Sequence, residues 1–248
     1  MRTAIPGVVA LVLVSAPATA HAGRTFYGWL YGTEVMPERG VEITNTIDEE
    51  NGFFGDADVH WTTWGFSAEV GVTDQFTIAF PMDFVWRDSA ATEPSFSFAE
   101  FGIEGRYRLV SSDPVEAPPF APLIRAGVKR SVLERDILIA EADLVASTTT
   151  ESGSVHALID IGYRGQFLGD ETQHEIRPGA GVSFKIVGDL RLGAEAVASI
   201  NVDNKDSRYV VVGPNAAWTH GRMWVSASFG IGVYQIDTAP RAVWGILF

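Results

Sequence analysis

The stretch FTIAFPMDFVWRD, residues 76–88, places an apolar side chain at every second position from Phe76 to Trp86. The positions between them are mixed and include Thr77, Asp83 and Arg87. Because a β-strand points alternate side chains to opposite faces, this stretch predicts a strand with one wholly apolar face. It is longer than most strands of soluble sheets, whereas a tilted membrane-spanning strand needs about 9–11 residues in the bilayer.

The same alternation recurs along the chain, in LRLGAEAVASINVD (190–203), MWVSASFGIGVY (223–234) and RAVWGILF (241–248). No Pro/Gly/Ser-rich linker divides these segments, so they indicate one all-β domain. We predict strands at residues 40–50, 57–73, 76–88, 95–110, 120–131, 137–148, 154–167, 174–187, 190–202, 208–218, 222–235 and 241–248. A water-soluble sandwich is the alternative, but the long strands and the aromatic residues near strand ends favour a membrane barrel.

The connections between the predicted strands alternate in character. TDQ (73–75), GD (188–189) and HGR (220–222) are tight turns. Longer and mostly acidic connections are DEENGFFGDAD (48–58), RDSAATEPS (87–95), GDETQH (169–174) and NVDNKDS (201–207). Such asymmetry is typical of outer-membrane barrels, with short periplasmic turns and longer outer loops. The exception is SSDPVEAPP (111–119), which is long for a periplasmic turn.

The first 22 residues predict a secretory signal peptide, with a basic start, an apolar core and small residues before a cut after Ala22. The chain has no cysteine, which excludes both a disulfide framework and a lipid-anchored N-terminus. It carries 31 acidic against 18 basic residues, and this balance argues against a nucleic-acid partner. We expect no cofactor.

The C-terminal strand resembles that of bacterial outer-membrane β-barrel proteins. In that class, a terminal amphipathic strand that closes on Phe is an address read by the barrel-assembly machinery. The matching residues here are Ala242, Trp244, Ile246 and Phe248. The resemblance implies a single antiparallel up-and-down barrel of about twelve strands in the outer membrane of a Gram-negative bacterium. Its partners would be outer-membrane lipid, lipopolysaccharide and the assembly machinery.

A shorter stretch, TEVMPERGVEITNTI (33–47), resembles the start of a group of outer-membrane barrels, some of which are labelled transporters. There, a Pro–x–basic–Gly turn and a Glu two residues later lead into the first strand; Pro37, Arg39, Gly40 and Glu42 fill those positions. We therefore predict a barrel over residues 40–248, preceded by a periplasmic or lumenal segment at residues 23–39.

If the apolar sets face lipid, the intervening sets line the lumen. The predicted inward acids are Glu42, Glu69, Asp83, Glu100, Glu104, Glu141, Asp143, Asp160 and Glu195, and the inward bases are Arg87, Arg106, Arg108, Arg125, Lys129, Arg164, Arg177, Lys185 and Arg191. Antiparallel pairing brings Arg125 and Lys129 close to Glu141 and Asp143. This charged lumen is either a rigid, salt-bridged filling or a narrow polar channel, and strand number alone does not decide between them.

The leading functional hypothesis is a small channel or transporter for small polar solutes; the alternative is a non-conducting structural or interaction barrel. An outer-membrane lipase or protease ranks third, because Asp160 would lie about 13 Å along the strand from His156, too far for the bond that orients a catalytic base. No metal site is predicted; Asp48, Glu50, Asp56 and Asp58 are a weak calcium candidate, and a solvated acidic loop is the simpler interpretation.

Overall fold

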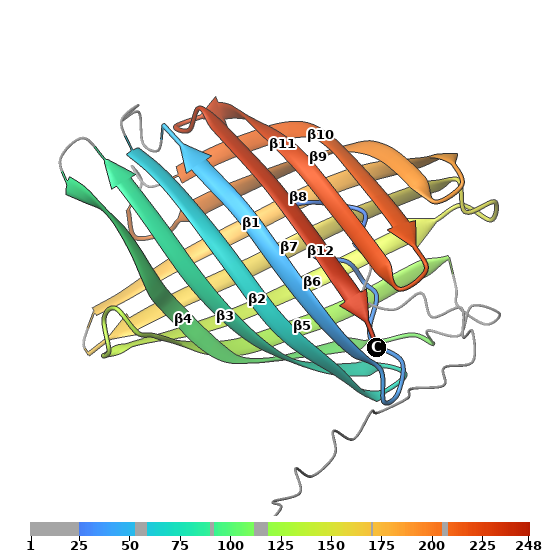
Figure 1. Ribbon diagram of the computed structural model, residues 1–248, viewed down its shortest axis with the longest axis horizontal. Helices are drawn as coiled ribbons and strands as arrows, with labels where there is room; N and C mark the ends of the chain where they lie inside the picture. Colours follow the sequence, from blue (N-terminus) through green and yellow to red (C-terminus); the bar gives the residue numbers. More distant parts are fainter. Residues whose placement is uncertain (1–24, 53–58, 90–91, 112–118, 170, 205–207) are drawn as a thin grey trace, which may run out of the picture.

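The computed structural model describes residues 25–52, 59–89, 92–111, 119–169, 171–204 and 208–248 (Figure 1). The predicted signal peptide, residues 1–22, lies outside these ranges, as do Asp56 and Asp58 of the calcium candidate. Within them, no helix is long and apolar enough to cross a membrane.

Twelve antiparallel strands close into one barrel, which confirms the predicted all-β fold. The strands are β1 (Val41–Asn51), β2 (Val59–Thr73), β3 (Phe76–Ser89), β4 (Thr92–Arg108), β5 (Phe120–Ser131), β6 (Ile137–Thr149), β7 (Val155–Leu168), β8 (Glu171–Val187), β9 (Leu190–Asn201), β10 (Arg208–His220), β11 (Met223–Tyr234) and β12 (Thr238–Leu247). Each pairs with its sequence neighbours, and β1 pairs with β12, with Ile43 opposite Ile246, so the sheet has no free edge.

The barrel has two rims, which we name by their distance from the C-terminus. The near rim carries the C-terminus and the connections at residues 74–75, 109–119, 150–154, 188–189 and 221–222. The far rim carries the connections at residues 52–58, 90–91, 132–136, 169–170, 202–207 and 235–237.

The expected length of the far-rim loops was wrong in two places. β3 continues to Ser89 and β4 begins at Thr92, so most of RDSAATEPS is strand. In the same way, β7 ends at Leu168 and β8 begins at Glu171. Polar residues at these strand ends do not stop the ladder, because its hydrogen bonds join backbone groups.

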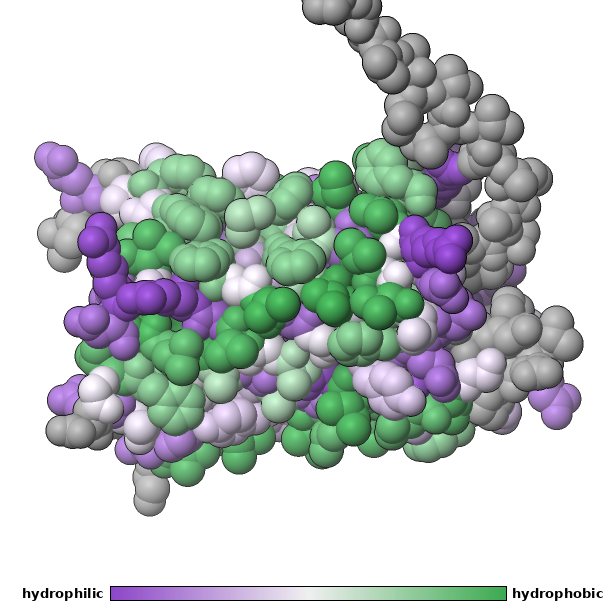
Figure 2. Space-filling model, turned by 90° about the horizontal axis from the view of Figure 1, so that it is seen from below, coloured by the Kyte–Doolittle hydropathy of each residue, from purple (hydrophilic) through white to green (hydrophobic). Residues whose placement is uncertain are grey.

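The barrel is apolar outside and polar inside. Figure 2 shows hydrophobic residues gathered over the middle of the outer surface, with hydrophilic residues toward both ends. Phe80, Leu144 and Ile159 are exposed on this surface, whereas Glu69, Arg125 and Glu141 are buried within the barrel. This distribution is the reverse of a soluble protein and matches an outward apolar band with a polar lumen.

The N-terminal segment enters the wall through a tight turn. The Gly40 amide donates to the Pro37 carbonyl at 2.8 Å, and Arg39 holds a positive φ of 65° at the third position of this turn. The Arg39 amide donates to the Gly71 carbonyl at 2.9 Å. The turn is thereby fixed to β2 just before β1 begins.

Candidate functional site: the plugged, charged lumen

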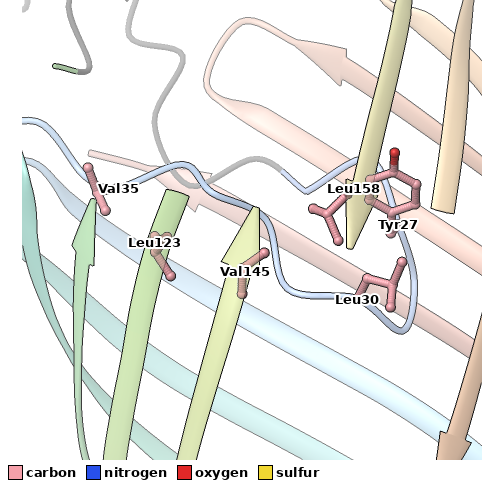
Figure 3. Packing of buried hydrophobic residues seen from close by; sticks show 6 residues of the cluster. All are labelled: Tyr27, Leu30, Val35, Leu123, Val145 and Leu158. Atoms are coloured by element: carbon pink, nitrogen blue, oxygen red, sulfur yellow. The ribbon is translucent and has the colours of Figure 1, made fainter. Parts of the chain in front are cut away.

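Residues 25–36, which we call the plug segment, lie inside the barrel. Tyr27 meets His156 near the near-rim end of β7, whereas Trp29 packs toward the far rim and donates to the Ala239 carbonyl of β12. Figure 3 shows the segment crossing the inner face of the wall, with its side chains beside those of β5, β6 and β7. Its residues in the shared apolar cluster are Tyr27, Leu30 and Val35, which pack with Leu123, Val145 and Leu158 of the wall. All six are at most 5% exposed, so the segment has a small apolar core of its own within a polar lumen.

Two carboxylates of the wall hold the backbone of the plug segment. Glu195 on β9 accepts hydrogen bonds from three successive amides, those of Gly28 at 2.8 Å, Trp29 at 3.0 Å and Leu30 at 3.3 Å. Asp160 on β7 accepts from the Tyr31 amide at 3.4 Å. Hydrogen bonds to an ionised acceptor are stronger than neutral ones, so Glu195 is the main polar anchor of the segment.

Two glycines of β8 make room for the plug segment against the wall. A Cβ atom at Gly181 would collide with the Tyr27 ring, and one at Gly179 would collide with the Leu30 side chain. Both glycines face inward on β8, where a larger side chain would occupy the place of the segment.

His156, the histidine weighed as a catalytic base, is a partner of the plug segment. The Tyr27 hydroxyl lies 3.0 Å from its Nδ1, and the Phe26 ring meets it edge-on with centroids 5.0 Å apart. Burial raises the pKa of the Tyr27 hydroxyl, so this tyrosine stays neutral. The His156 ring, 3% exposed, is therefore engaged in packing rather than presented to a substrate.

Arg125 is the centre of an ion-pair network in the middle of the lumen. Its guanidinium contacts Glu104 at 2.6 Å, Glu141 at 2.9 Å and Asp143, its direct cross-strand partner. It is 1% exposed, and three surrounding carboxylates compensate for the loss of water.

Glu141 joins this centre to the neighbouring strands. It lies 3.6 Å from Lys129, 3.3 Å from Arg164 and 3.7 Å from Arg177. Eleven predicted lumen residues meet in the resulting network, with Glu175 as an addition: Glu69, Asp83, Glu100, Glu104, Arg106, Arg125, Lys129, Glu141, Asp143, Arg164 and Arg177.

The network and the plug segment are in direct contact. The Arg125 guanidinium lies 4.0 Å from the centroid of the Tyr31 ring, in cation–π geometry. Burial raises the pKa of the Tyr31 hydroxyl, so the ring is neutral and the contact is not an ion pair. A movement of the segment would therefore disturb the central arginine.

A cavity of about 630 Å³ occupies the lumen beyond the plug segment. Its lining extends from Gly28–Gly32 of the segment to Leu133 and Glu134 of the far-rim turn between β5 and β6. The ion-pair network lines one side, and Asp48, Glu50 and Arg241 line another. The cavity is thus polar and enclosed by the barrel wall, and the plug segment forms part of its lining.

The remaining predicted lumen residues divide into two groups. Glu42, Arg108, Asp160, Arg191 and Glu195 bond to the wall or the plug segment rather than to the network. Arg87 and Lys185 are exposed near strand ends, and Arg87 stacks 5.6 Å over Trp61. Arg87 nevertheless lines the cavity toward the far rim, whereas Lys185 lies at the near-rim end of β8.

Four further charged groups of the lumen were missed or placed in a loop. Asp48 and Glu50 belong to β1 and line the cavity, and Glu175 and Arg241 do so from β8 and β12. Each of the four lies an even number of residues along its strand from an inward-facing residue, namely Glu42, Arg177 or Leu247. That spacing could have assigned them to the lumen from the sequence. Among the described residues, no group of three or more histidines and acids is arranged to hold a metal ion.

The C-terminal residues keep the alternation of their sequence. Ile246 and Phe248 are exposed on the outer surface at 37% and 56%, whereas Leu247 between them is buried. Ala242 and Trp244 share the outward face, and Phe248 is tied to β1 by its amide, which donates to the Val41 carbonyl at 2.8 Å.

Solved structures share this fold at low sequence identity. An outer membrane channel from Pseudomonas putida F1 matches with a TM-score of 0.59 and 9% identity, over 87% of this chain and 98% of its own. The β domain of the Bordetella autotransporter BrkA matches at 0.57 and 11%, over 85% and 100%. The NanC porin matches at 0.54 and 9%, over 83% and 98%. No known protein family matches the sequence, and no curated protein is detectably similar.

Proposed function

We propose that the mature protein is an outer-membrane channel for small polar solutes, narrowed by its plug segment. The observation that carries this proposal is the charged cavity of about 630 Å³ inside a closed barrel. A barrel that served only as a scaffold would gain stability from a lumen filled throughout by side chains. Here the space beyond the plug segment is open and lined by ionisable groups.

The proposed location rests on the surface of the barrel. Its apolar outer band suits lipid, its ends are hydrophilic, and the N-terminus carries a signal-peptide pattern. Two of the similar structures are described as an outer membrane channel and a porin. The surrounding partners would be outer-membrane lipid and lipopolysaccharide, with the near rim in the periplasm.

A non-conducting structural barrel is the second candidate, and the ion-pair network favours it. Five bases and seven acids span β2 to β8 through contacts of 4.0 Å or less, which would stiffen the wall. The two candidates differ in whether solute passes through the cavity.

Narrowing the cavity should slow solute entry. Thr63 lines the cavity from β2, so Thr63→Trp is expected to reduce severalfold the swelling rate of proteoliposomes in small sugars and amino acids. Its neighbour Thr62 faces the opposite side of the same strand, so Thr62→Trp provides the matched control. Equal swelling rates for the two variants and the wild-type chain would place the permeation pathway outside the cavity. Liposomes that never swell, with a correctly folded barrel, would favour the scaffold.

Loss of the terminal aromatic residue should impair membrane insertion. Phe248→Asp, or deletion of Phe248, removes the last outward apolar side chain of the pattern read by the barrel-assembly machinery. We expect less heat-modifiable barrel in outer-membrane fractions. Tyr234→Asp, which alters an exposed aromatic residue at the far end of β11, is the control. An undiminished amount of barrel in the Phe248 variants would contradict the assembly role.

A further inference from the structure

The charged residues that line the cavity are ion-paired on one side and lack close ion pairs on the other. On the side formed by β2–β7, every cavity-lining base except Arg87 makes an ion pair within 4.0 Å. On the side formed by β12 and β1, Asp48 and Glu50 make no ion pair within that distance among the described residues. A carboxylate in an enclosed lumen is less well hydrated than in bulk water, so these two groups have capacity for a cationic partner.

The nearest base to these carboxylates along the ladder, Arg241, forms no close ion pair with either of them among the described residues. Arg241 is the cross-strand partner of Asp48, but its guanidinium stacks 5.0 Å over the Trp29 ring of the plug segment. Its Nε is buried and has no hydrogen-bond partner among the described residues. Glu50 accepts a hydrogen bond from the Tyr209 hydroxyl at 3.0 Å and makes no ion pair within 4.0 Å in the described chain.

A second guanidinium in the cavity is only loosely paired. Arg177 on β8 lies 3.7 Å from Glu141 and 3.9 Å from Glu175, beyond hydrogen-bond distance. Its Nε and one terminal nitrogen are buried without a hydrogen-bond partner in the described chain. Buried donors that remain unpaired in a cavity are the groups that a carboxylate ligand would satisfy.

We infer that the cavity takes a zwitterionic solute, a small molecule with an ammonium and a carboxylate group such as an amino acid. This inference deepens the channel proposed above and rests on the same cavity. The ammonium group binds Asp48 and Glu50, and the carboxylate binds the guanidinium of Arg177 or Arg241. A solute of one sign would meet only half of the unpaired groups, and a neutral sugar would meet neither with a charge-assisted hydrogen bond.

Calorimetric titration of the purified barrel in detergent tests this inference without requiring conductance. The probes are ω-amino acids of increasing length, from glycine to 6-aminohexanoate, with butylamine and butyrate as single-charge controls. One member of the series should bind at least about tenfold more tightly than either control, because it gains a second charge-assisted contact. The preferred length reports the distance between the two binding groups.

Single substitutions separate the two ends of the site. Asp48→Asn should weaken binding of the preferred ω-amino acid and of butylamine while leaving butyrate unchanged. Arg177→Gln should weaken binding of the preferred ω-amino acid and of butyrate while leaving butylamine unchanged. Glu134→Gln, a cavity-lining carboxylate at the far-rim turn, is the matched control and should change neither.

Failure of this inference is distinguishable from failure of the proposed channel. Swelling without any preference for zwitterions would overturn the inference and leave the channel. Binding of ω-amino acids by a barrel that never conducts would leave the site and overturn the channel. No binding of any probe by a folded barrel would show that water alone satisfies these groups.

Discussion

Replacing Arg125 with alanine is expected to lower the free energy of unfolding by about 3–5 kcal/mol, the usual effect of removing one partner from a buried ion pair. Three carboxylates face this guanidinium, and its removal leaves them with repulsion and incomplete solvation. The Tyr31 ring also loses its cation, so the plug segment should loosen. Urea titration of the barrel refolded into lipid vesicles measures this change.

A partner substitution and a control make this prediction specific. Adding Asp143→Ala should restore part of the lost stability, because one of the three uncompensated charges is removed. Arg130→Ala, on the exposed outer face of the same strand, should have a small effect. Strict additivity of Arg125→Ala and Asp143→Ala would show that the two residues are not coupled, and the lumen there would be wide and wet.

Displacing the plug segment should open the barrel. Gly181→Val puts a side chain where the Tyr27 ring now lies, and valine is well suited to a strand, so the wall should still form. The segment would then lose the packing of Tyr27 against the wall, although the Glu195 carboxylate could still accept hydrogen bonds from the Gly28 and Trp29 amides. We expect a severalfold rise in single-channel conductance in planar bilayers and increased sensitivity of cells to small polar antibiotics.

The matched control lies one residue away. Ala180 faces outward on the same strand, so Ala180→Val adds a similar volume to the lipid-facing surface and should leave conductance unchanged. Glu195→Gln is an independent route to the same result, because it keeps the shape of the anchor and removes its charge. Wild-type conductance in both Gly181→Val and Glu195→Gln would show that the plug segment does not limit flow.

The sequence predicted the barrel well because each long strand repeats the same signal. In β3, Phe80 and Asp83 alternate between lipid and lumen, and such alternation sustained along β9 and β11 leaves little choice of fold. Loop lengths were less predictable. Ser89 and Thr92 lie in the polar stretch RDSAATEPS, yet both belong to strands, because backbone pairing with the adjacent strand outweighs local preference.

The contents of the lumen were predictable only in part. Parity assigned Arg125 and Asp143 to the interior, and cross-strand register placed them opposite each other. The position of the plug segment inside the barrel was not predictable from the sequence. Contacts such as the hydrogen bond between Gly28 and Glu195 join residues far apart in the chain, and no periodic pattern indicates them. Gly181 illustrates this limit: its meaning depends on Tyr27, which reaches it from another part of the chain.

Thiol block of the current through a single lumenal cysteine tests the central claim most directly. The chain has no native cysteine, so Thr63→Cys in the Gly181→Val background places one thiol in the cavity. We predict discrete conductance steps in planar bilayers that fall sharply after a bulky, membrane-impermeant thiol reagent is added, and no such fall for Thr62→Cys in the same background. A current that the reagent leaves unchanged at Thr63→Cys, despite complete labelling shown by mass spectrometry, would contradict passage through this cavity.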